Sequence, residues 1–308
     1  MKIGIIGAGN VGSTIAYTLA IGEAVSEIVL VDKNIDKAKG EVLDIRHGLP
    51  FIPYLDLRAG DYESLEGMDA VVLTAGLPRR PGQSRLDLAK NNINLFKQII
   101  PKLVEVNPDC IILVVSNPVD ILTYAAYKIS GFPAHRVFGS GNVLDSARFR
   151  SMLGDYFQID PANIHAYILG EHGDSGFPLL SQAFAGCTPL TKLPGYDERQ
   201  IMGICENVKS VAAKVIKYKG STYYAVSLGV QKILSAIDHD QNRVLPVSTY
   251  LSDYFGVSDV CLSVPAVVNR DGIREVLRVP FTDLEETNFR DCAKKIKRVL
   301  MESGLKDE

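Results

Sequence analysis

Short apolar runs alternate with amphipathic segments along the first half of the chain. The apolar runs predict buried strands at residues 2–6, 28–31, 70–73 and 110–115. Between them, apolar residues recur at helical spacing, as Val11, Ile15 and Leu19 do, and a long helix is predicted over residues 86–106. Strands that are apolar throughout and alternate with helices are typical of a parallel sheet with both faces covered.

The pattern changes near residue 139. It predicts helices at residues 143–156, 197–219 and 222–237, and strands at residues 164–169, 244–252, 259–268 and 273–279. Thr282 and Glu285 form a capping box that predicts a last helix. The sequence therefore predicts an α/β fold, with a doubly wound parallel sheet in residues 1–139 and an α+β domain with antiparallel sheets in residues 140–308.

A glycine-rich turn follows the first strand and opens the first helix, in the run Gly7-Ala8-Gly9-Asn10-Val11-Gly12. Gly7 permits the tight turn, Gly9 lets the backbone approach a pyrophosphate, and Gly12 lets the helix pack on the strand. The whole run is a candidate cofactor site, because a helix N-terminus offers free N–H groups to phosphate. Asp32, after the next strand, can accept both ribose hydroxyls and would repel a 2′-phosphate. The motif thus predicts a Rossmann-type domain that binds NAD rather than NADP.

Composition excludes several classes of function. The chain has 308 residues, a net charge of −3 and a pI near 6.0, so nothing suggests a nucleic-acid partner or a membrane surface. Five cysteines are scattered without a C-x-x-C pair, which argues against a disulfide framework and against a metal site. The N-terminal apolar run is too short for a signal peptide, and a reduced cytoplasm is the simplest location.

Three residues of the second half are candidates for proton chemistry and ion pairing. His172 lies in Gly170-Glu171-His172-Gly173-Asp174 after a predicted strand, where an imidazole can exchange a proton near neutral pH. Asp145 and Arg148 lie on one face of a predicted helix, and a carboxylate beside an imidazole would fix its tautomer. A loop histidine bonded to its own backbone, and a surface ion pair, are the simpler alternatives.

Asn117 is a candidate for ligand binding in the first half. It follows the strand at residues 110–115, and the polar segment at residues 76–85 follows the neighbouring strand. Because ligands bind at the carboxyl ends of parallel strands, we expect both segments to meet the glycine turn in one crevice. A turn-capping role for Asn117 is equally compatible with the local sequence.

Five segments carry a resemblance to a known family: residues 7–12 with Asp32, then residues 81–88, 116–120, 143–148 and 170–174. In these motifs, and in their order, the chain resembles the L-lactate/L-malate dehydrogenase family over essentially its whole length. The resemblance implies an NAD-dependent oxidoreductase that interconverts a 2-keto acid and an L-2-hydroxy acid by hydride transfer. A non-catalytic NAD-binding regulatory protein is the alternative from another class, since it would need neither His172 nor Arg148.

The resemblance also implies the role of each site residue. His172 would donate and accept the proton, with Asp145 as its carboxylate partner. Arg148 would hold the substrate carboxylate in a bidentate pair. Arg85, on a mobile loop, would close over the substrate and polarise its carbonyl group. Asn117 would orient both the substrate and the nicotinamide.

Two residues give opposite indications of the substrate. By resemblance, Arg79 occupies the loop position that reads the far end of the substrate, where malate-type members carry Arg and lactate-type members Gln. Pyruvate would leave this guanidinium without a partner, at a cost of about 2–4 kcal/mol. Thr222 lies where lactate-type pockets often carry Thr, a size difference worth only about 1–3 kcal/mol. Malate and oxaloacetate are therefore expected to be favoured, with lactate and pyruvate as the alternative.

Regulation and assembly follow from the resemblance alone. Arg150 and His165 fall where bacterial lactate dehydrogenases bind fructose 1,6-bisphosphate between subunits. An exposed helical arginine and a histidine packed in an interface would explain the pair equally well, so both interpretations stay open. The resemblance further implies a homotetramer or a homodimer.

Overall fold

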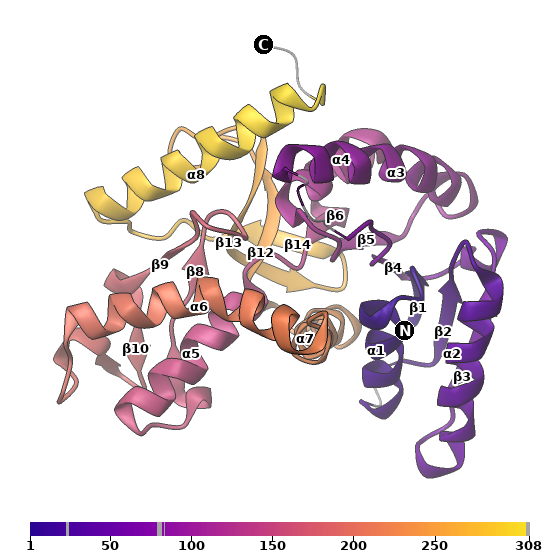
Figure 1. Ribbon diagram of the computed structural model, residues 1–308, viewed down its shortest axis with the longest axis horizontal. Coiled ribbons are helices and arrows are strands. Elements are labelled where there is room, and N and C mark those ends of the chain that lie inside the picture. Colours follow the sequence, from indigo (N-terminus) through magenta and orange to yellow (C-terminus); the bar gives the residue numbers. More distant parts are fainter. Residues whose placement is uncertain (23–24, 79–81, 83, 306–308) are drawn as a thin grey trace.

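The computed structural model describes residues 1–22, 25–78, 82 and 84–305 (Figure 1). Its helices are α1 (Asn10–Ile21), α2 (Ile35–His47), α3 (Arg85–Val106), α4 (Val119–Ser130), α5 (Val143–Phe157), α6 (Glu198–Lys219), α7 (Tyr224–Asp238) and α8 (Asp283–Glu302). Its strands are β1 (Lys2–Ile6), β2 (Glu27–Val31), β3 (Asp56–Gly60), β4 (Ala70–Leu73), β5 (Ile111–Val114), β6 (Val137–Gly139), β7 (Ile164–His165), β8 (Ile168–Leu169), β9 (Phe177–Pro178), β10 (Phe184–Ala185), β11 (Thr188–Pro189), β12 (Arg243–Leu251), β13 (Val260–Asn269) and β14 (Gly272–Val276).

One nine-stranded sheet runs through the molecule in the order β14-β13-β12-β6-β5-β4-β1-β2-β3. The six strands from β6 to β3 are parallel, and their order makes this half a doubly wound, Rossmann-type sheet. The chain reverses its winding direction between β1 and β4, so the expected ligand crevice lies beyond the carboxyl ends of these strands. The predicted fold class is thereby confirmed.

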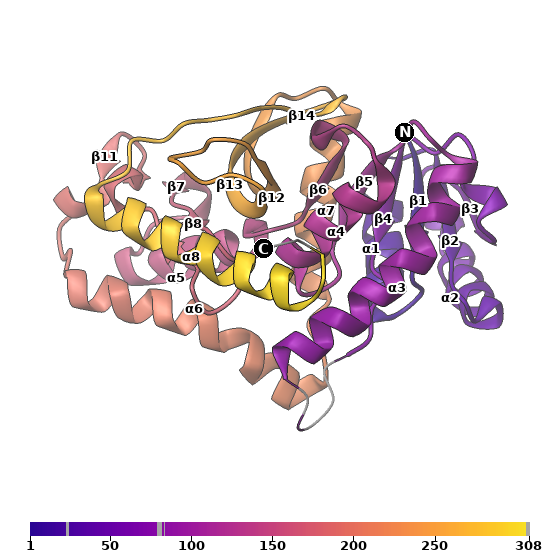
Figure 2. The ribbon, with the colours of Figure 1, turned by 90° about the horizontal axis from the view of Figure 1, so that it is seen from above.

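The central parallel strands β1, β2, β4 and β5 are almost entirely apolar because both faces of the sheet are buried there, whereas the edge strand β3 carries Asp56 and Arg58. Val71 and Leu73 of β4 pack into a core with α3, α4 and α8, which cover the same side (Figure 2). Ala70 and Val72 point the other way, into a core with α1, α2 and α7. Alternate residues of one strand therefore serve two different cores, as the continuous apolar runs predict.

The second half differs from the sequence prediction in two places. The strands β12 to β14 are antiparallel as expected, but β12 pairs with β6, so they extend the main sheet instead of forming a separate one. The single strand predicted at residues 164–169 is in fact two, because β7 pairs with β10 whereas β8 pairs with β9. Because of this break, β8 is paired with β9, and the loop that carries His172 connects these two strands.

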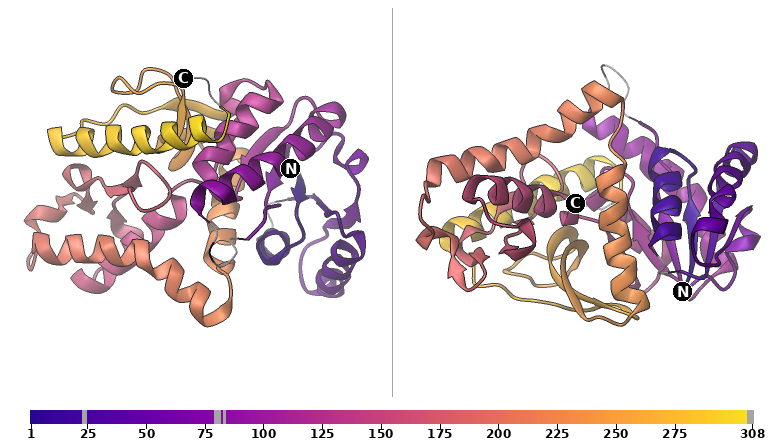
Figure 3. Two further views of the ribbon diagram at one scale, coloured as in Figure 1. Left: turned by 45° about the horizontal axis from the view of Figure 1, so that its top comes forward. Right: turned by 90° about the horizontal axis from the view of Figure 1, so that it is seen from below.

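Helix α7 connects the two halves of the molecule. It packs against α1 on one side and α5 on the other (Figure 3). The contact with α1 includes a buried hydrogen bond, in which Oγ1 of Thr18 donates to Oγ of Ser227 at 3.0 Å. Among the helices of the described residues, none combines the length and the apolarity that crossing a bilayer requires.

Candidate active site

The glycine turn between β1 and α1 is crowded on one side and open on the other. Gly7 has a φ of +116°, and a Cβ at Gly12 would lie 1.8 Å from the carbonyl oxygen of Gly7. A Cβ at Gly9 would meet no heavy atom within 4 Å, so a ligand has room there. No side chain of the described residues caps the N-terminus of α1. Because no described side chain occupies its first N–H groups, the start of α1 suits a phosphate.

Asp32 lies beside this turn, directly after β2. Its Oδ2 accepts a hydrogen bond from the N–H of Ala8 at 2.7 Å, and its Oδ1 accepts one from the N–H of Asn34 at 2.9 Å. A carboxylate has about four acceptor positions, so both oxygens can still accept from ribose hydroxyls. The residues present thus fit a dinucleotide: an open glycine turn for the pyrophosphate and a fixed carboxylate for the ribose.

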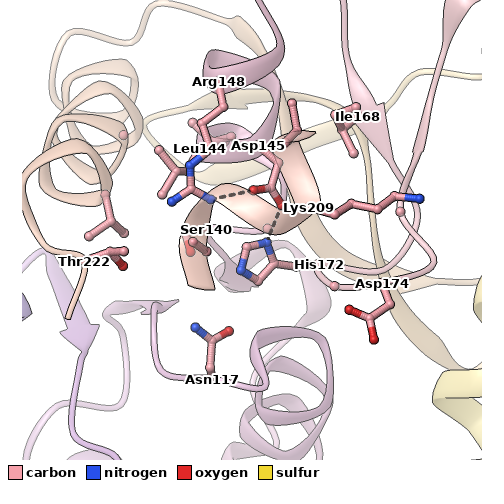
Figure 4. Close-up of a pocket in the computed structure, with 18 of the residues that line it drawn as sticks. Asn117, Ser140, Leu144, Asp145, Arg148, Ile168, His172, Asp174, Lys209 and Thr222 are labelled. Atoms are coloured by element: carbon pink, nitrogen blue, oxygen red, sulfur yellow. Dashed lines mark hydrogen bonds and ion pairs between the residues drawn. The ribbon is translucent and has the colours of Figure 1, made fainter. Parts of the chain in front are cut away.

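His172, Asp145 and Arg148 form one hydrogen-bonded group in the wall of a cavity of about 320 Å³ (Figure 4). Nδ1 of His172 lies 2.7 Å from Oδ2 of Asp145, and Nη1 of Arg148 donates to Oδ1 of Asp145 at 2.9 Å. Asp145 and Arg148 are one turn apart on α5, whereas His172 comes from the loop between β8 and β9. Because Asp145 engages Nδ1, the opposite nitrogen of the ring, Nε2, is left for a ligand.

Charges around the imidazole favour its protonated form. Burial alone would lower the pKa of His172, but the Asp145 carboxylate more than compensates and raises that pKa above its ordinary value. Burial would likewise raise the pKa of Asp145, yet His172 and Arg148 together hold it below its usual range. Asp145 is therefore ionised near neutral pH and stabilises an imidazolium that can donate a proton from Nε2.

Two further predicted residues line the same cavity. Asn117 follows β5, and its Oδ1 accepts a hydrogen bond from the N–H of Val119 at 3.3 Å, which leaves its NH₂ group for a ligand. Thr222 lies in the connection between α6 and α7 (Figure 4). Val11 of α1 also lines the cavity, so the glycine turn, the end of β5 and the His172 loop do converge. The peptide bond between Asn117 and Pro118 is cis.

Arg85 lies at the rim of the cavity. It is the first residue of α3, and its Nη2 is 2.8 Å from Oδ2 of Asp174, which follows His172 by two positions. The two side chains are 58% and 69% exposed. Exposed ion pairs are weak, so Arg85 can exchange Asp174 for a ligand at little cost.

Asp120 was not predicted as a site residue, but it is a buried carboxylate that contacts the His172 loop. It is 2% exposed, and its Oδ2 accepts a hydrogen bond from the N–H of His172 at 2.7 Å. Its Oδ1 accepts one from Oγ of Ser248 at 2.6 Å. Burial raises the pKa of Asp120 to about 6, although both hydrogen bonds oppose this. Its place in the motif at residues 116–120 was the available signal, but the contact with His172 spans 52 positions of the sequence.

Two predicted residues lie elsewhere, and a third, Arg79, falls outside the described residues. Arg150 of α5 donates through Nη2 to the carbonyl oxygens of Pro161 and Ala162, at 3.0 and 3.4 Å. His165 lies in β7 and is exposed. Neither Arg150 nor His165 lines the cavity that contains His172.

Known families and proteins match the chain along nearly its full length. The model of the lactate/malate dehydrogenase NAD binding domain matches residues 1–139, and that of the lactate/malate dehydrogenase alpha/beta C-terminal domain matches residues 142–306. The L-lactate dehydrogenase of Thermoanaerobacter pseudethanolicus is 49% identical, over 99% of this chain and 99% of its own. The L-lactate dehydrogenase of Acetivibrio thermocellus is 47% identical, over 97% of this chain and 96% of its own. The crystal structure of the minor L-lactate dehydrogenase from Enterococcus mundtii is 36% identical, covers 100% and 99% of the two chains, and gives a TM-score of 0.96.

These similarities contradict the expectation that malate and oxaloacetate are favoured. Relatives that are 43–49% identical over nearly the full chain are named L-lactate dehydrogenase. The expectation rested on one residue, Arg79. The residue type alone does not determine whether the guanidinium group of Arg79 contacts the far end of a substrate.

Proposed function

The chain belongs to the lactate/malate dehydrogenase family as an NAD-dependent 2-hydroxy acid dehydrogenase, and we propose that it is an L-lactate dehydrogenase. Its substrates would be pyruvate and L-lactate. The observation that carries the proposal is its similarity to relatives named L-lactate dehydrogenase, which extends over nearly the full length of both chains.

The cavity offers a cation for one carboxylate and an apolar surface for a methyl group. Arg148 lies beside His172 and can bind the carboxylate of pyruvate. The methyl group of pyruvate suits the apolar part of the wall that includes Leu144 and Ile168 (Figure 4).

The glycine turn and Asp32 would hold the cofactor. The N–H groups at the start of α1 would bind the pyrophosphate, and Asp32 would accept from the ribose hydroxyls. When bound, NADH supplies the hydride that converts the keto carbon into the hydroxyl-bearing carbon, and NAD⁺ accepts it in reverse. Asn117, at the end of β5, would direct its NH₂ group toward the substrate carbonyl and the nicotinamide side of the cavity.

The proton and the orientation of the substrate would come from three side chains. Arg148 would bind the substrate carboxylate with the guanidinium N–H groups that Asp145 does not use. This places the keto oxygen at Nε2 of His172, which donates its proton as the oxygen gains negative charge. Asp145 stabilises the imidazolium before transfer and fixes the tautomer after it. Arg85 would leave Asp174, add a positive charge beside the oxygen and help to exclude water.

We also propose that the chain forms a homo-oligomer. Tyr17 and Ile21 of α1 are 53% and 49% exposed, and Tyr224 and Leu228 of the adjacent α7 are 66% and 59% exposed. Large apolar side chains gathered on two packed helices are typical of an interface. Light scattering coupled to size-exclusion chromatography tests this, and a monomer of 33.6 kDa at micromolar concentration would contradict it.

Arg150 and His165 remain the proposed effector site for fructose 1,6-bisphosphate. Nε of Arg150 is buried and has no hydrogen-bond partner among the described residues. The carbonyl groups that Arg150 contacts belong to the turn that leads into β7, where His165 lies. A phosphate would bind to guanidinium N–H groups of Arg150 that these carbonyl oxygens do not use.

The decisive experiment compares substrates directly. NADH oxidation is followed at saturating cofactor with pyruvate and, separately, with oxaloacetate, and kcat/KM is determined for each. We expect pyruvate to be preferred by at least about tenfold, and the reverse reaction to accept L-lactate but not D-lactate. Preference for oxaloacetate would refute the proposal. Oxidation with neither acid, while NADH still binds, would favour a regulatory protein.

A further inference from the structure

Asn92 is a buried amide of α3 that contacts the backbone of two segments of the site. Asn92 is only 1% exposed to solvent. Its Oδ1 accepts a hydrogen bond from the N–H of Leu77 at 2.8 Å, and its Nδ2 donates to the carbonyl oxygen of Leu77 at 3.4 Å. The same Nδ2 donates to the carbonyl oxygen of Asn117 at 2.8 Å. The amide group thus uses both its oxygen and its nitrogen on backbone groups.

The contact with Leu77 fixes the base of the segment that ends at Arg85. Leu77 lies just beyond β4, and Arg85, at the other end of this segment, begins the helix that carries Asn92. One side chain therefore ties the start of the segment to the helix at its end. Leu77 is thereby held at a fixed position relative to α3, the helix whose first residue is Arg85.

The contact with Asn117 fixes a group that faces the substrate. The carbonyl of Asn117 belongs to the residue whose NH₂ group is directed to the cavity. A neighbouring bond reinforces this link, because Oγ of Ser116 donates to the carbonyl oxygen of Ala75 at 2.7 Å. The ends of β4 and β5 are thereby held at a constant spacing beside the cavity.

We propose that Asn92 is a positioning residue for the reaction, which holds the backbone of Leu77 and the backbone of Asn117 in one fixed arrangement. It acts through Asn117, which faces the cavity, and through α3, the helix that begins with Arg85. The inference rests on the proposed function, because it assumes a keto acid that these two residues contact. The pyrophosphate and the ribose would be held by the glycine turn and Asp32, which Asn92 does not contact, so NADH affinity should fall much less than substrate affinity.

The chain contains a matched control for this residue. Asn107, the C-cap of the same helix, is 5% exposed, and its Nδ2 donates to the carbonyl oxygens of Leu65 and Met68, both at 2.8 Å. Asn92→Asp and Asn107→Asp each replace a buried NH₂ group that donates to two carbonyl oxygens with a repelling oxygen. Both should lower the melting temperature, whereas only Asn92→Asp should impair substrate binding.

The test measures two affinities for each variant in the full-length protein. NADH binding to the free enzyme is followed by cofactor fluorescence, and binding of oxamate, an unreactive isostere of pyruvate, is measured on the enzyme–NADH complex. For Asn92→Asp we expect oxamate affinity and kcat/KM for pyruvate to fall at least about tenfold, with NADH affinity changed less than about threefold. For Asn107→Asp all three should change less than about threefold.

The inference is overturned if Asn92→Asp loses no more oxamate affinity than Asn107→Asp, or if its NADH affinity falls in parallel. Should Asn92→Asp not fold, Asn92→Ser, which removes the amide without adding a charge, is compared with Asn107→Ser under the same criteria. The wild type is first assayed with pyruvate and oxaloacetate. If oxaloacetate proves the better substrate, the proposed function fails, and the same ratios are measured with that acid.

Discussion

Replacement of Asp145 by Asn should impair pyruvate reduction by weakening the proton donor. The variant removes the carboxylate that lies 2.7 Å from Nδ1 of His172 and keeps the shape of the side chain. At a charge separation of about 4 Å and an effective dielectric constant of about 20, the lost attraction is about 4 kcal/mol. Since about 1.4 kcal/mol corresponds to a factor of ten, the imidazolium population near neutral pH should fall about a hundredfold to a thousandfold.

Arg148 should add to this effect. Its Nη1 lies 2.9 Å from the same carboxylate, and its positive charge opposes protonation of His172. Without Asp145 this charge is no longer compensated, so the pKa of His172 falls further. Pyruvate reduction requires the protonated ring, whereas lactate oxidation requires the neutral ring. The activity of the variant in reduction should therefore decline from a lower pH than in the wild type.

Steady-state oxidation of NADH with pyruvate between pH 5 and pH 9 measures this directly. We expect kcat/KM at pH 7 to fall about a hundredfold to a thousandfold in Asp145→Asn. The control is Asp155→Asn, which removes an exposed carboxylate from the same helix and should change kcat/KM less than about twofold. A variant within threefold of the wild type at pH 7, with an unchanged pH dependence, would show that Asp145 does not support the proton donor.

Three further predictions concern binding. Arg148→Lys should raise the KM for pyruvate about a hundredfold and leave that for NADH nearly unchanged, since an ammonium group cannot form a bidentate pair; an equal rise in both values would contradict this. Gly12→Ala should lower both the melting temperature and NADH affinity, because its Cβ would lie 1.8 Å from the carbonyl oxygen of Gly7; calorimetry and fluorescence titration that match the wild type would disprove the steric argument. Millimolar fructose 1,6-bisphosphate should lower the KM for pyruvate in the wild type but not in Arg150→Gln, and a KM that the effector leaves constant in both would remove the effector site.

Elements with a strong local signal were predictable from the sequence. The glycine turn between two apolar runs locates β1, α1 and β2, and the capping box of Thr282 and Glu285 locates the start of α8. Helix α4 was not predicted, because most of its residues are buried and its N-cap residue, Pro118, provides no side-chain capping signal. The break between β7 and β8 was also missed, since it depends on pairing partners, β10 and β9, that follow later in the chain.

The same distinction applies to the site. The residue types of His172, Asp145 and Arg148 indicated their chemistry, but only the fold shows that α5 and the β8–β9 loop bring them into contact. The contacts of Asp120 and Asn92 could not be predicted from the sequence. A single buried polar residue produces no local pattern, and the partners of both residues are distant in sequence. The predicted preference for malate and oxaloacetate was wrong because it rested on the charge of Arg79 alone, without the position of that side chain relative to a substrate.

We propose that a protonated His172, held by Asp145, binds the carbonyl oxygen of a keto acid whose carboxylate Arg148 holds. The most direct test is the affinity of the wild-type enzyme–NADH complex for oxamate between pH 5 and pH 10. We expect a constant affinity at low pH. Above the pKa of His172 the affinity should weaken tenfold for each unit of pH, with uptake of one proton on binding in that range. An affinity independent of pH over the whole range, with no proton uptake, would contradict this proposal.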